Sequence, residues 1–236
     1  MEKIKIFIPI SLVIFYTTLM LFASYKVKTA GFFKVSNNDY ISFQCNYQSL
    51  LLMITALCLL LTYFINPENF MHYFSFGNVA APAEGLKWMG IKSKDSWMQT
   101  GISLSIIISL VTGIFMYLQM KQIEVNWTIL SSSLVWIIVF SLSNSFAEEM
   151  IFRMGIVSPL KGLISPMAIY SISAVLFGIP HFAGMPNGII GATMAGVLGF
   201  VLAKSLYETN GFFWAWLIHF LQDVLIIGGI YLMRKV

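Results

Sequence analysis

The chain has 236 residues, of which 58% are hydrophobic and only 10% are charged. Soluble globular domains carry about a quarter charged residues, so this chain lacks the polar surface that would face water on every side. The composition therefore excludes a soluble domain and predicts an integral membrane protein with the lipid bilayer as its partner. The formal net charge of +4 and the 15% of aromatic residues indicate anchoring at the membrane interface. They do not favour binding to nucleic acid.

Seven apolar segments are long enough to cross a bilayer, which takes about 20 residues of helix. The first is longer than the apolar region of a signal peptide, so it is expected to be a spanning helix. The predicted spans, in chain order, are 5–25, 48–66, 98–119, 127–157, 165–182, 187–204 and 211–233. Seven spans place the two termini on opposite sides of the membrane. Lysine and arginine are divided almost evenly between the sides, which leaves the orientation undecided.

The predicted fold class is all-α: a polytopic membrane helix bundle of about seven transmembrane helices that encloses a polar cavity. Residues 1–97 are expected to form an N-terminal two-helix region with a long connecting loop. Residues 98–236 are expected to form the membrane core that carries the chemistry. The expected location is a cell membrane, most simply the plasma membrane, crossed several times.

Most charged residues fall in loops or near the ends of the predicted spans, and the exceptions are Glu148, Glu149, Arg153, His181, His219 and Asp223. A single Asp or Arg at the centre of a spanning helix costs roughly 2.5–3.5 kcal/mol on insertion scales. A lone histidine or a lone Glu–Arg pair is more often structural, but these groups come from three predicted helices. They are therefore expected to face one another or a wet cavity, which in a membrane indicates a functional site.

The spacing of these groups predicts which of them pair. Glu149 and Arg153 are four residues apart and share one helix face. Glu148 is turned about 100° away, so it stays available as a base. His219 and Asp223 are also four residues apart, and an acidic neighbour orients an imidazole ring. Pro180, directly before His181, predicts a distorted or ending helix at that point.

The depth of the groups raises a difficulty for a shared site. Helical rise places Glu148 and His219 roughly 12–13 Å from one membrane surface, and His181 roughly 24 Å from the same surface. A shared site therefore requires the fifth span to tilt or the boundaries near residues 155–165 to shift, and the fourth span is expected to be long and tilted.

Three ordered motifs resemble those of the CPBP family of intramembrane proteases, named for CAAX proteases and bacteriocin-processing enzymes and also called the Abi family. EEMIFR fits Glu-Glu-x-x-x-Arg, FGIPH fits Phe-x-x-x-His from Phe177 to His181, and HFLQD fits His-x-x-x-Asn/Asp. The resemblance covers about residues 98–233. It implies an endopeptidase that cleaves hydrophobic or membrane-tethered peptides and proteins within the membrane plane.

The resemblance also implies a role for each matching residue. Glu148 would activate the attacking water as general base, and His181 would position that water or act on the leaving group. His219 and Asp223 would form the polar cradle of the oxyanion, with Asp223 orienting His219 because an ionised carboxylate has no hydrogen to donate. Residues with a supporting role would be Glu149, Arg153 and Phe177.

No cofactor is expected, and zinc is the alternative, with Glu148, His181 and His219 as ligands. The sequence has no HExxH motif, and its two cysteines form no metal-binding pair. Two other functions stay open: a non-catalytic membrane immunity or scaffold protein on the same fold, and a small-solute or proton-coupled carrier. Inverted repeats, which would favour a carrier, are not found.

Overall fold

The computed structural model describes residues 2–30, 33–121, 125, 127–184 and 186–233. In that part of the chain all the regular elements are helices, which confirms the all-α class. The longer ones are α1 (Glu2–Ala30), α2 (Asp39–Ile65), α4 (Trp97–Met120), α5 (Thr128–Glu149), α7 (Pro166–Gly178), α8 (Gly188–Thr209) and α9 (Phe213–Leu232). The shorter ones are α3 (Pro67–Tyr73), η1 (Lys87–Met89), η2 (Met150–Met154), α6 (Gly155–Leu160) and η3 (Pro180–Ala183).

Seven stretches of helix among the described residues are long and apolar enough to cross a membrane, as predicted. The second begins at Asp39, nine residues before the predicted start at 48. The reason is the side chain of Asn38, which accepts hydrogen bonds from the backbone N–H groups of Tyr40 and Ile41 and so caps the helix. The residues that follow the cap are partly polar, which hid the first turns of this helix from a hydropathy reading.

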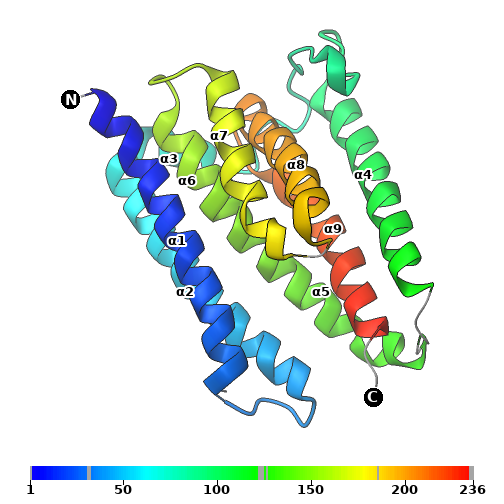
Figure 1. The fold of residues 1–236 in the computed structure, drawn as a ribbon. Coiled ribbons are helices and arrows are strands. Elements are labelled where there is room, and N and C mark those ends of the chain that lie inside the picture. The colour runs from blue at the N-terminus through cyan, green and yellow to red at the C-terminus, as the bar shows by residue number, and fades with distance from the viewer. Residues whose placement is uncertain (1, 31–32, 122–124, 126, 185, 234–236) are drawn as a thin grey trace.

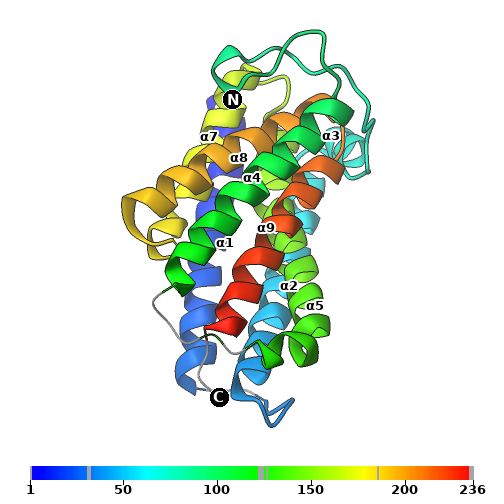
Figure 2. The same cartoon turned by 90° about the vertical axis from the view of Figure 1, so that its right-hand side faces the viewer.

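The helices form a bundle in which α1 and α2 pack side by side along one edge (Figure 1). Along the opposite edge α9 packs against both α4 and α5. The hairpin of α7 and α8 lies between these groups, and its turn ends part-way down the bundle (Figures 1 and 2). The α1 helix begins at the upper end and α9 ends at the lower end, as an odd number of spans requires.

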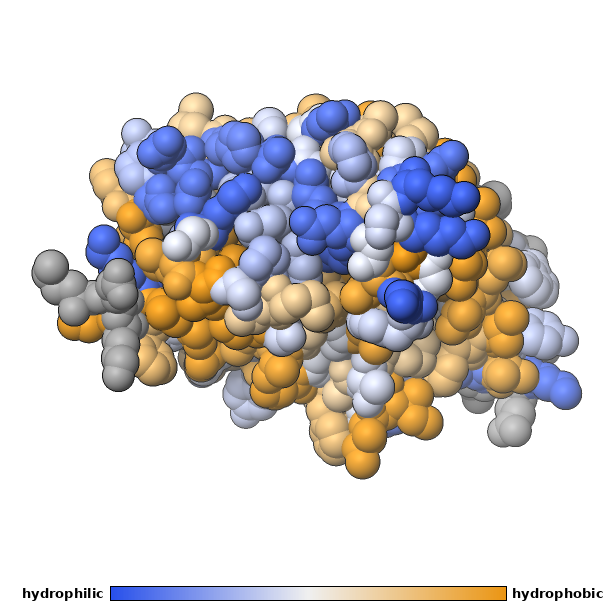
Figure 3. Space-filling model, turned by 90° about the horizontal axis from the view of Figure 1, so that it is seen from above, coloured by the Kyte–Doolittle hydropathy of each residue, from blue (hydrophilic) through white to orange (hydrophobic). Residues whose placement is uncertain are grey.

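Hydrophilic residues gather on the upper end of the bundle, while its flanks are largely apolar (Figure 3). The connection between α3 and α4 lies at this end and carries the exposed Lys87, Lys92 and Lys94. Exposed apolar residues such as Phe22, Leu110 and Val135 are distributed over the spanning helices. This distribution is that of a multi-pass integral membrane protein with an aqueous face at the upper end.

The fourth span is the longest and is interrupted by one wider turn. α5, the π-helical turn η2 and α6 follow one another without a break from Thr128 to Leu160, about 50 Å at 1.5 Å per residue. The hydrocarbon core of a bilayer is about 30 Å thick, so a helix of this length must tilt. The π turn begins directly after Glu149, and such turns are frequent at functional sites.

The fourth span ends later in the chain than predicted, at Leu160, and this brings the expected depths of Glu148 and His181 in the membrane closer together. Glu148 lies twelve residues before Leu160, or about 18 Å from the upper end of α6. His181 lies fifteen residues after Pro166, or about 22 Å into the hairpin. The two residues thus reach similar depths because the boundaries near residue 160 shift, one of the two solutions expected from the sequence. The predicted division of the chain at residue 97 stays a prediction.

The upper end of α4 is anchored to α8 and α9. Trp97 is fully buried and donates from its indole Nε1 to Glu208 Oε2 at 2.8 Å, and Glu208 also pairs with the buried Lys204. One turn into α4, Gly101 lies against the indole ring of Trp214, so closely that a β-carbon at residue 101 would overlap that ring. This contact fixes α4 beside the cavity described below.

We expect Gly101→Ala to lower the thermal unfolding temperature of the purified protein in detergent, because overpacking costs about 1–3 kcal/mol. Gly113→Ala is the matched control in the same helix, since a β-carbon there meets no atom within 4 Å. It should be neutral or stabilising by up to about 1 kcal/mol, because alanine is the better helix former. Equal shifts for the two variants would contradict the described packing of α4 on α9.

Candidate active site

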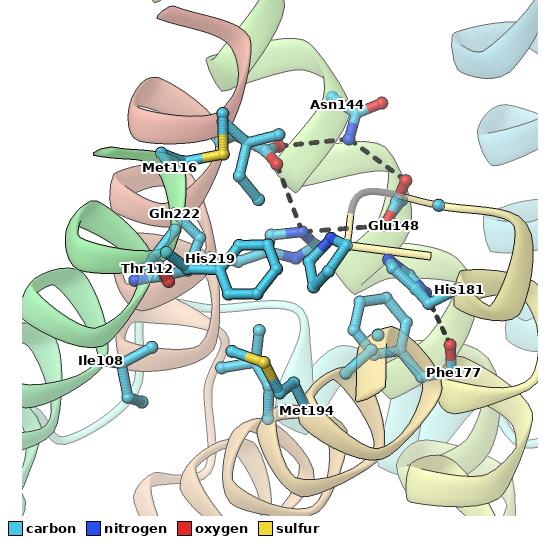
Figure 4. Close-up of a pocket in the computed structure, with 18 of the residues that line it drawn as sticks. Ile108, Thr112, Met116, Asn144, Glu148, Phe177, His181, Met194, His219 and Gln222 are labelled. Atoms are coloured by element: carbon cyan, nitrogen blue, oxygen red, sulfur yellow. Dashed lines mark hydrogen bonds and ion pairs between the residues drawn. The ribbon is translucent and has the colours of Figure 1, made fainter. Parts of the chain in front are cut away.

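The four residues predicted to be catalytic line one cavity of about 270 Å³ among α4, α5, the α7–α8 hairpin and α9 (Figure 4). Glu148 comes from α5, His181 from η3, and His219 with Asp223 from α9. The remaining wall is mostly apolar and includes Ile108, Phe115, Met116, Met194, Leu198 and Ile226. The cavity therefore combines a small ionisable cluster with an apolar surface, the usual make-up of a ligand site.

Glu149 is the buried centre of the polar cluster, with an exposed fraction of 0%. Its Oε2 lies 3.1 Å from Nε of Arg153, the pair expected from their spacing. Its Oε1 lies 2.7 Å from Nδ1 of His219, a contact with α9 that spacing within one helix does not reveal. The guanidinium of Arg153 in turn lies 3.9 Å from the ring centre of Phe177 on α7. One carboxylate thus ties α5 directly to α9 and, through Arg153, to α7.

Glu148 differs from its neighbour in its contacts with charged groups: its ion pair with His219 is long, at 3.7 Å, whereas Glu149 has ion pairs at 3.1 and 2.7 Å. Oε1 accepts from Nδ2 of Asn144 at 3.1 Å. Oε2 is buried, makes no hydrogen bond to any described residue, and lies 3.7 Å from Nε2 of His219. A buried carboxylate oxygen without a partner calls for a water molecule or a substrate group. The two adjacent glutamates therefore have different surroundings, as their rotation about the helix predicts.

The hydrogen bond to Glu149 sets the orientation of the imidazole ring of His219. With Nδ1 donating to Oε1 of Glu149, the other nitrogen, Nε2, faces two carboxylates. It lies 3.7 Å from Oε2 of Glu148 and 3.7 Å from Oδ1 of Asp223. Both distances exceed hydrogen-bond length, so Nε2 makes no hydrogen bond to either carboxylate.

His181 lies at the turn of the α7–α8 hairpin, where Pro180 ends the α-helix and starts the 3₁₀ turn η3. Its Nδ1 donates to the backbone carbonyl of Phe177 at 2.7 Å. The imidazole also lies against the ring of Phe177, with centroids 4.4 Å apart. This leaves Nε2 as the ring nitrogen with a lone pair on the side of the cavity (Figure 4).

Asn144 and Gln222 also line the cavity and were missed by the search for ionisable groups. Nδ2 of Asn144 donates to Glu148 Oε1 and to Asp223 Oδ2, both at 3.1 Å, and so bridges α5 and α9. Gln222 accepts from the hydroxyl of Thr112 and joins α9 to α4. Both are uncharged amides, but the signal for Asn144 was present, since it precedes Glu148 by four residues on one helix face.

Among the described residues no group of three or more His, Cys, Asp or Glu side chains is placed to hold a metal ion. Nδ1 of each active-site histidine is engaged, by Glu149 in one case and by a backbone carbonyl in the other, which leaves Nε2 of both rings without a hydrogen bond. Metal-bound histidines commonly have their other ring nitrogen held in this way, so zinc with Glu148, His181 and His219 as ligands stays a prediction.

Residues 130–225 match the family model described as type II CAAX prenyl endopeptidase, Rce1-like. This segment contains all the motif residues from Glu148 to Asp223. The match is to a family of proteases, and together with the seven apolar helices it supports the class of intramembrane proteases in general. Residues 130–225 are thus similar to the CAAX protease family, in agreement with the resemblance read from the three motifs. Neither the curated proteins nor the solved structures contain a match to the chain.

We expect Asn144→Ala to lower the rate of peptide hydrolysis about 10- to 100-fold. It removes two hydrogen bonds to carboxylates, and one such bond contributes about 1.5–3 kcal/mol, where 1.4 kcal/mol is a factor of ten in rate. The turnover of purified protein measures the loss. Ser171→Ala is the control, since that exposed hydroxyl donates only to the Met167 carbonyl of its own helix. Full activity of Asn144→Ala would show that the bridge does not position Glu148.

Proposed function

We propose that the protein hydrolyses a peptide bond of a hydrophobic or membrane-tethered peptide or protein, with Glu148 as the general base. The observation that carries this proposal is that Glu148 lines the apolar cavity, while its Oε2 is buried and has no hydrogen-bond partner among the described residues. A carboxylate oxygen without a hydrogen bond can accept a proton from a water molecule placed beside it. The position supports a water molecule between Glu148 and the Nε2 atoms of the two histidines.

In the proposed reaction, Glu148 takes a proton from this water while Nε2 of His181 accepts its other hydrogen as a hydrogen bond. The oxygen adds to the carbonyl carbon of the substrate, and the negative charge moves to the carbonyl oxygen. His219, with a proton on Nε2, donates to that oxyanion. The proton held by Glu148 passes to the nitrogen as the C–N bond breaks. One water is consumed, a carboxylic acid and an amine leave, and Glu148 returns to its ionised form.

Asp223 has a supporting role in this scheme. Ionised, it has no hydrogen to give an oxyanion, and it accepts one from Asn144 instead. Its other oxygen lies 3.7 Å from Nε2 of His219. Its charge therefore favours a proton on the nitrogen that faces the substrate, while Glu149 holds the opposite nitrogen.

The substrate class follows from the wall of the cavity. The methionine, isoleucine and phenylalanine side chains around it suit an apolar segment or an attached lipid chain. The matched family is described by its action on prenylated CAAX proteins, and a prenylated peptide is one ligand of the proposed class. A hydrophobic peptide without a lipid is another. The plasma membrane is the proposed location.

We expect new peptides and new protein N-termini in the membrane fraction of cells that carry the wild-type protein, and their loss in cells with Glu148→Gln. The amide keeps the size of the side chain but removes the base, and a general base contributes about 10²–10⁴ in rate. Mass spectrometry of cells with wild type, Glu148→Gln or no protein measures this and identifies the substrate. Fragments that persist with Glu148→Gln would favour the non-catalytic scaffold or immunity function.

We expect chelators to leave the activity unchanged, because the proposed base acts without a Lewis acid. Metal analysis of the purified protein gives a readout that does not depend on turnover, and less than about 0.1 zinc per chain is expected, since a full site would hold one ion. Stoichiometric zinc, lost together with activity on chelation and absent from His219→Ala, would contradict the metal-free reaction.

A further inference from the structure

A second cavity of about 270 Å³ lies on the opposite side of the hairpin turn, against α1 and α2. It shares Glu148, His181 and Gly184 with the cavity described above. The catalytic carboxylate therefore stands between two cavities, one facing α4, α8 and α9 and one facing the N-terminal helices. The polar side chains that α1 and α2 contribute to the second cavity are Thr17, Ser24 and Tyr47.

A third cavity, of about 420 Å³, follows one helical turn further along α1 and α2, toward their lower connection. Val27 and Lys28 lie one turn after Ser24, and Phe43 lies one turn before Tyr47. The rings of Phe43 and Tyr47 are stacked, with centroids 6.3 Å apart, at the boundary between the two cavities. The other polar side chains of this third cavity are Lys34, Asp39, Ser42 and Asn46. The two cavities thus form a series between the lower end of the bundle and Glu148.

The hydroxyl groups that line these two cavities indicate that the cavities hold water. In the spanning helices, serine and threonine hydroxyls commonly donate to the carbonyl four residues earlier, as Thr17 and Thr55 do here. Ser24 and the phenol of Tyr47 make no hydrogen bond to any described residue. An unpaired hydroxyl in hydrocarbon costs roughly 2–7 kcal/mol, whereas water in the cavity would satisfy it.

The proposed reaction also requires a second access to the site. Hydrolysis consumes one water at each turnover, and a bound substrate fills the apolar cavity on the α4 side. Glu148 lines both cavities, so the replacement water must reach it from the α1 and α2 side. We propose that the two cavities between α1 and α2 form a water passage from the lower end of the bundle to Glu148. The catalytic part of this inference rests on the proposed function; the presence of water does not.

Thiol labelling tests whether the passage holds water. Ser24→Cys is placed in a Cys45→Ser background, where Cys58 stays because it is fully buried. Phe22→Cys is the matched control, two residues away and 56% exposed on the surface of α1. Proteoliposomes carry a membrane-impermeant methanethiosulfonate on both sides. Because the reactive thiolate forms in water, Ser24→Cys should react at least about tenfold faster than Phe22→Cys.

The labelling outcome is independent of proteolysis. The same ratio is expected when Glu148→Gln is added, and both thiols should react equally after denaturation in detergent. If Ser24→Cys reacts as slowly as Phe22→Cys, the cavity holds lipid or is dry, and the passage is overturned even if Glu148 proves to be the base.

A kinetic comparison tests whether the passage supplies the reaction. Ser24→Leu fills the cavity and should lower kcat about tenfold with KM unchanged, because substrate binds on the other side of Glu148. Phe22→Leu, on the exposed face, should keep the wild-type kcat. A wild-type kcat for a folded Ser24→Leu variant would overturn the supply of water through this passage. A rise in KM alone would place substrate there and overturn it as well.

Discussion

The structure depends on one fully buried carboxylate, that of Glu149. It lies 3.1 Å from Arg153 and 2.7 Å from His219, and Arg153 lies over the ring of Phe177. A charge buried in this way is tolerated only with partners, and removing one partner of such a pair costs about 3–5 kcal/mol. Because Glu149 ends α5 and its partners come from η2 and α9, this single group sets how these helices meet at the site.

Because Arg153 and His219 hold Glu149, the adjacent Glu148 is left to act as the proposed base. One residue, or about 100° around the helix, separates a carboxylate held by Arg153 and His219 from that of Glu148. Oε2 of Glu148 makes no hydrogen bond to any described residue and lies 3.7 Å from Nε2 of His219. The π turn directly after Glu149 widens the helix where Arg153 must reach back to it. The hairpin turn that carries His181 lies beside Glu148. Both residues have the apolar cavity on one side and the hydroxyl-lined cavity of α1 and α2 on the other. In the proposed reaction, a hydrophobic substrate and a water molecule thus approach Glu148 from separate sides.

The seven spans and the three motifs could be read from the sequence, because hydrophobic length and the spacing of four residues act within single helices. The contacts between helices could not. Glu149 was expected to pair with Arg153 alone, and its bond to His219 depends on the packing of α5 against α9. Asn144 was overlooked because only ionisable groups were sought, although it lies one turn before Glu148. The sequence alone predicted no function for the N-terminal helices, because the relevance of Ser24 and Tyr47 depends on the cavity that they line.

The most direct test of this account compares the thermal unfolding of two variants that differ by one position, Glu148→Gln and Glu149→Gln, in the same detergent. Glu149→Gln should lower the stability by about 3–5 kcal/mol, because Arg153 and His219 lose their buried counter-charge. Glu148→Gln should unfold at or above the wild-type temperature, because a buried oxygen that makes no hydrogen bond is replaced by a neutral group, and the amide oxygen can still accept from Asn144. If Glu148→Gln is destabilised as strongly as Glu149→Gln, Glu148 is part of the structural framework and the division of roles between the two glutamates is wrong.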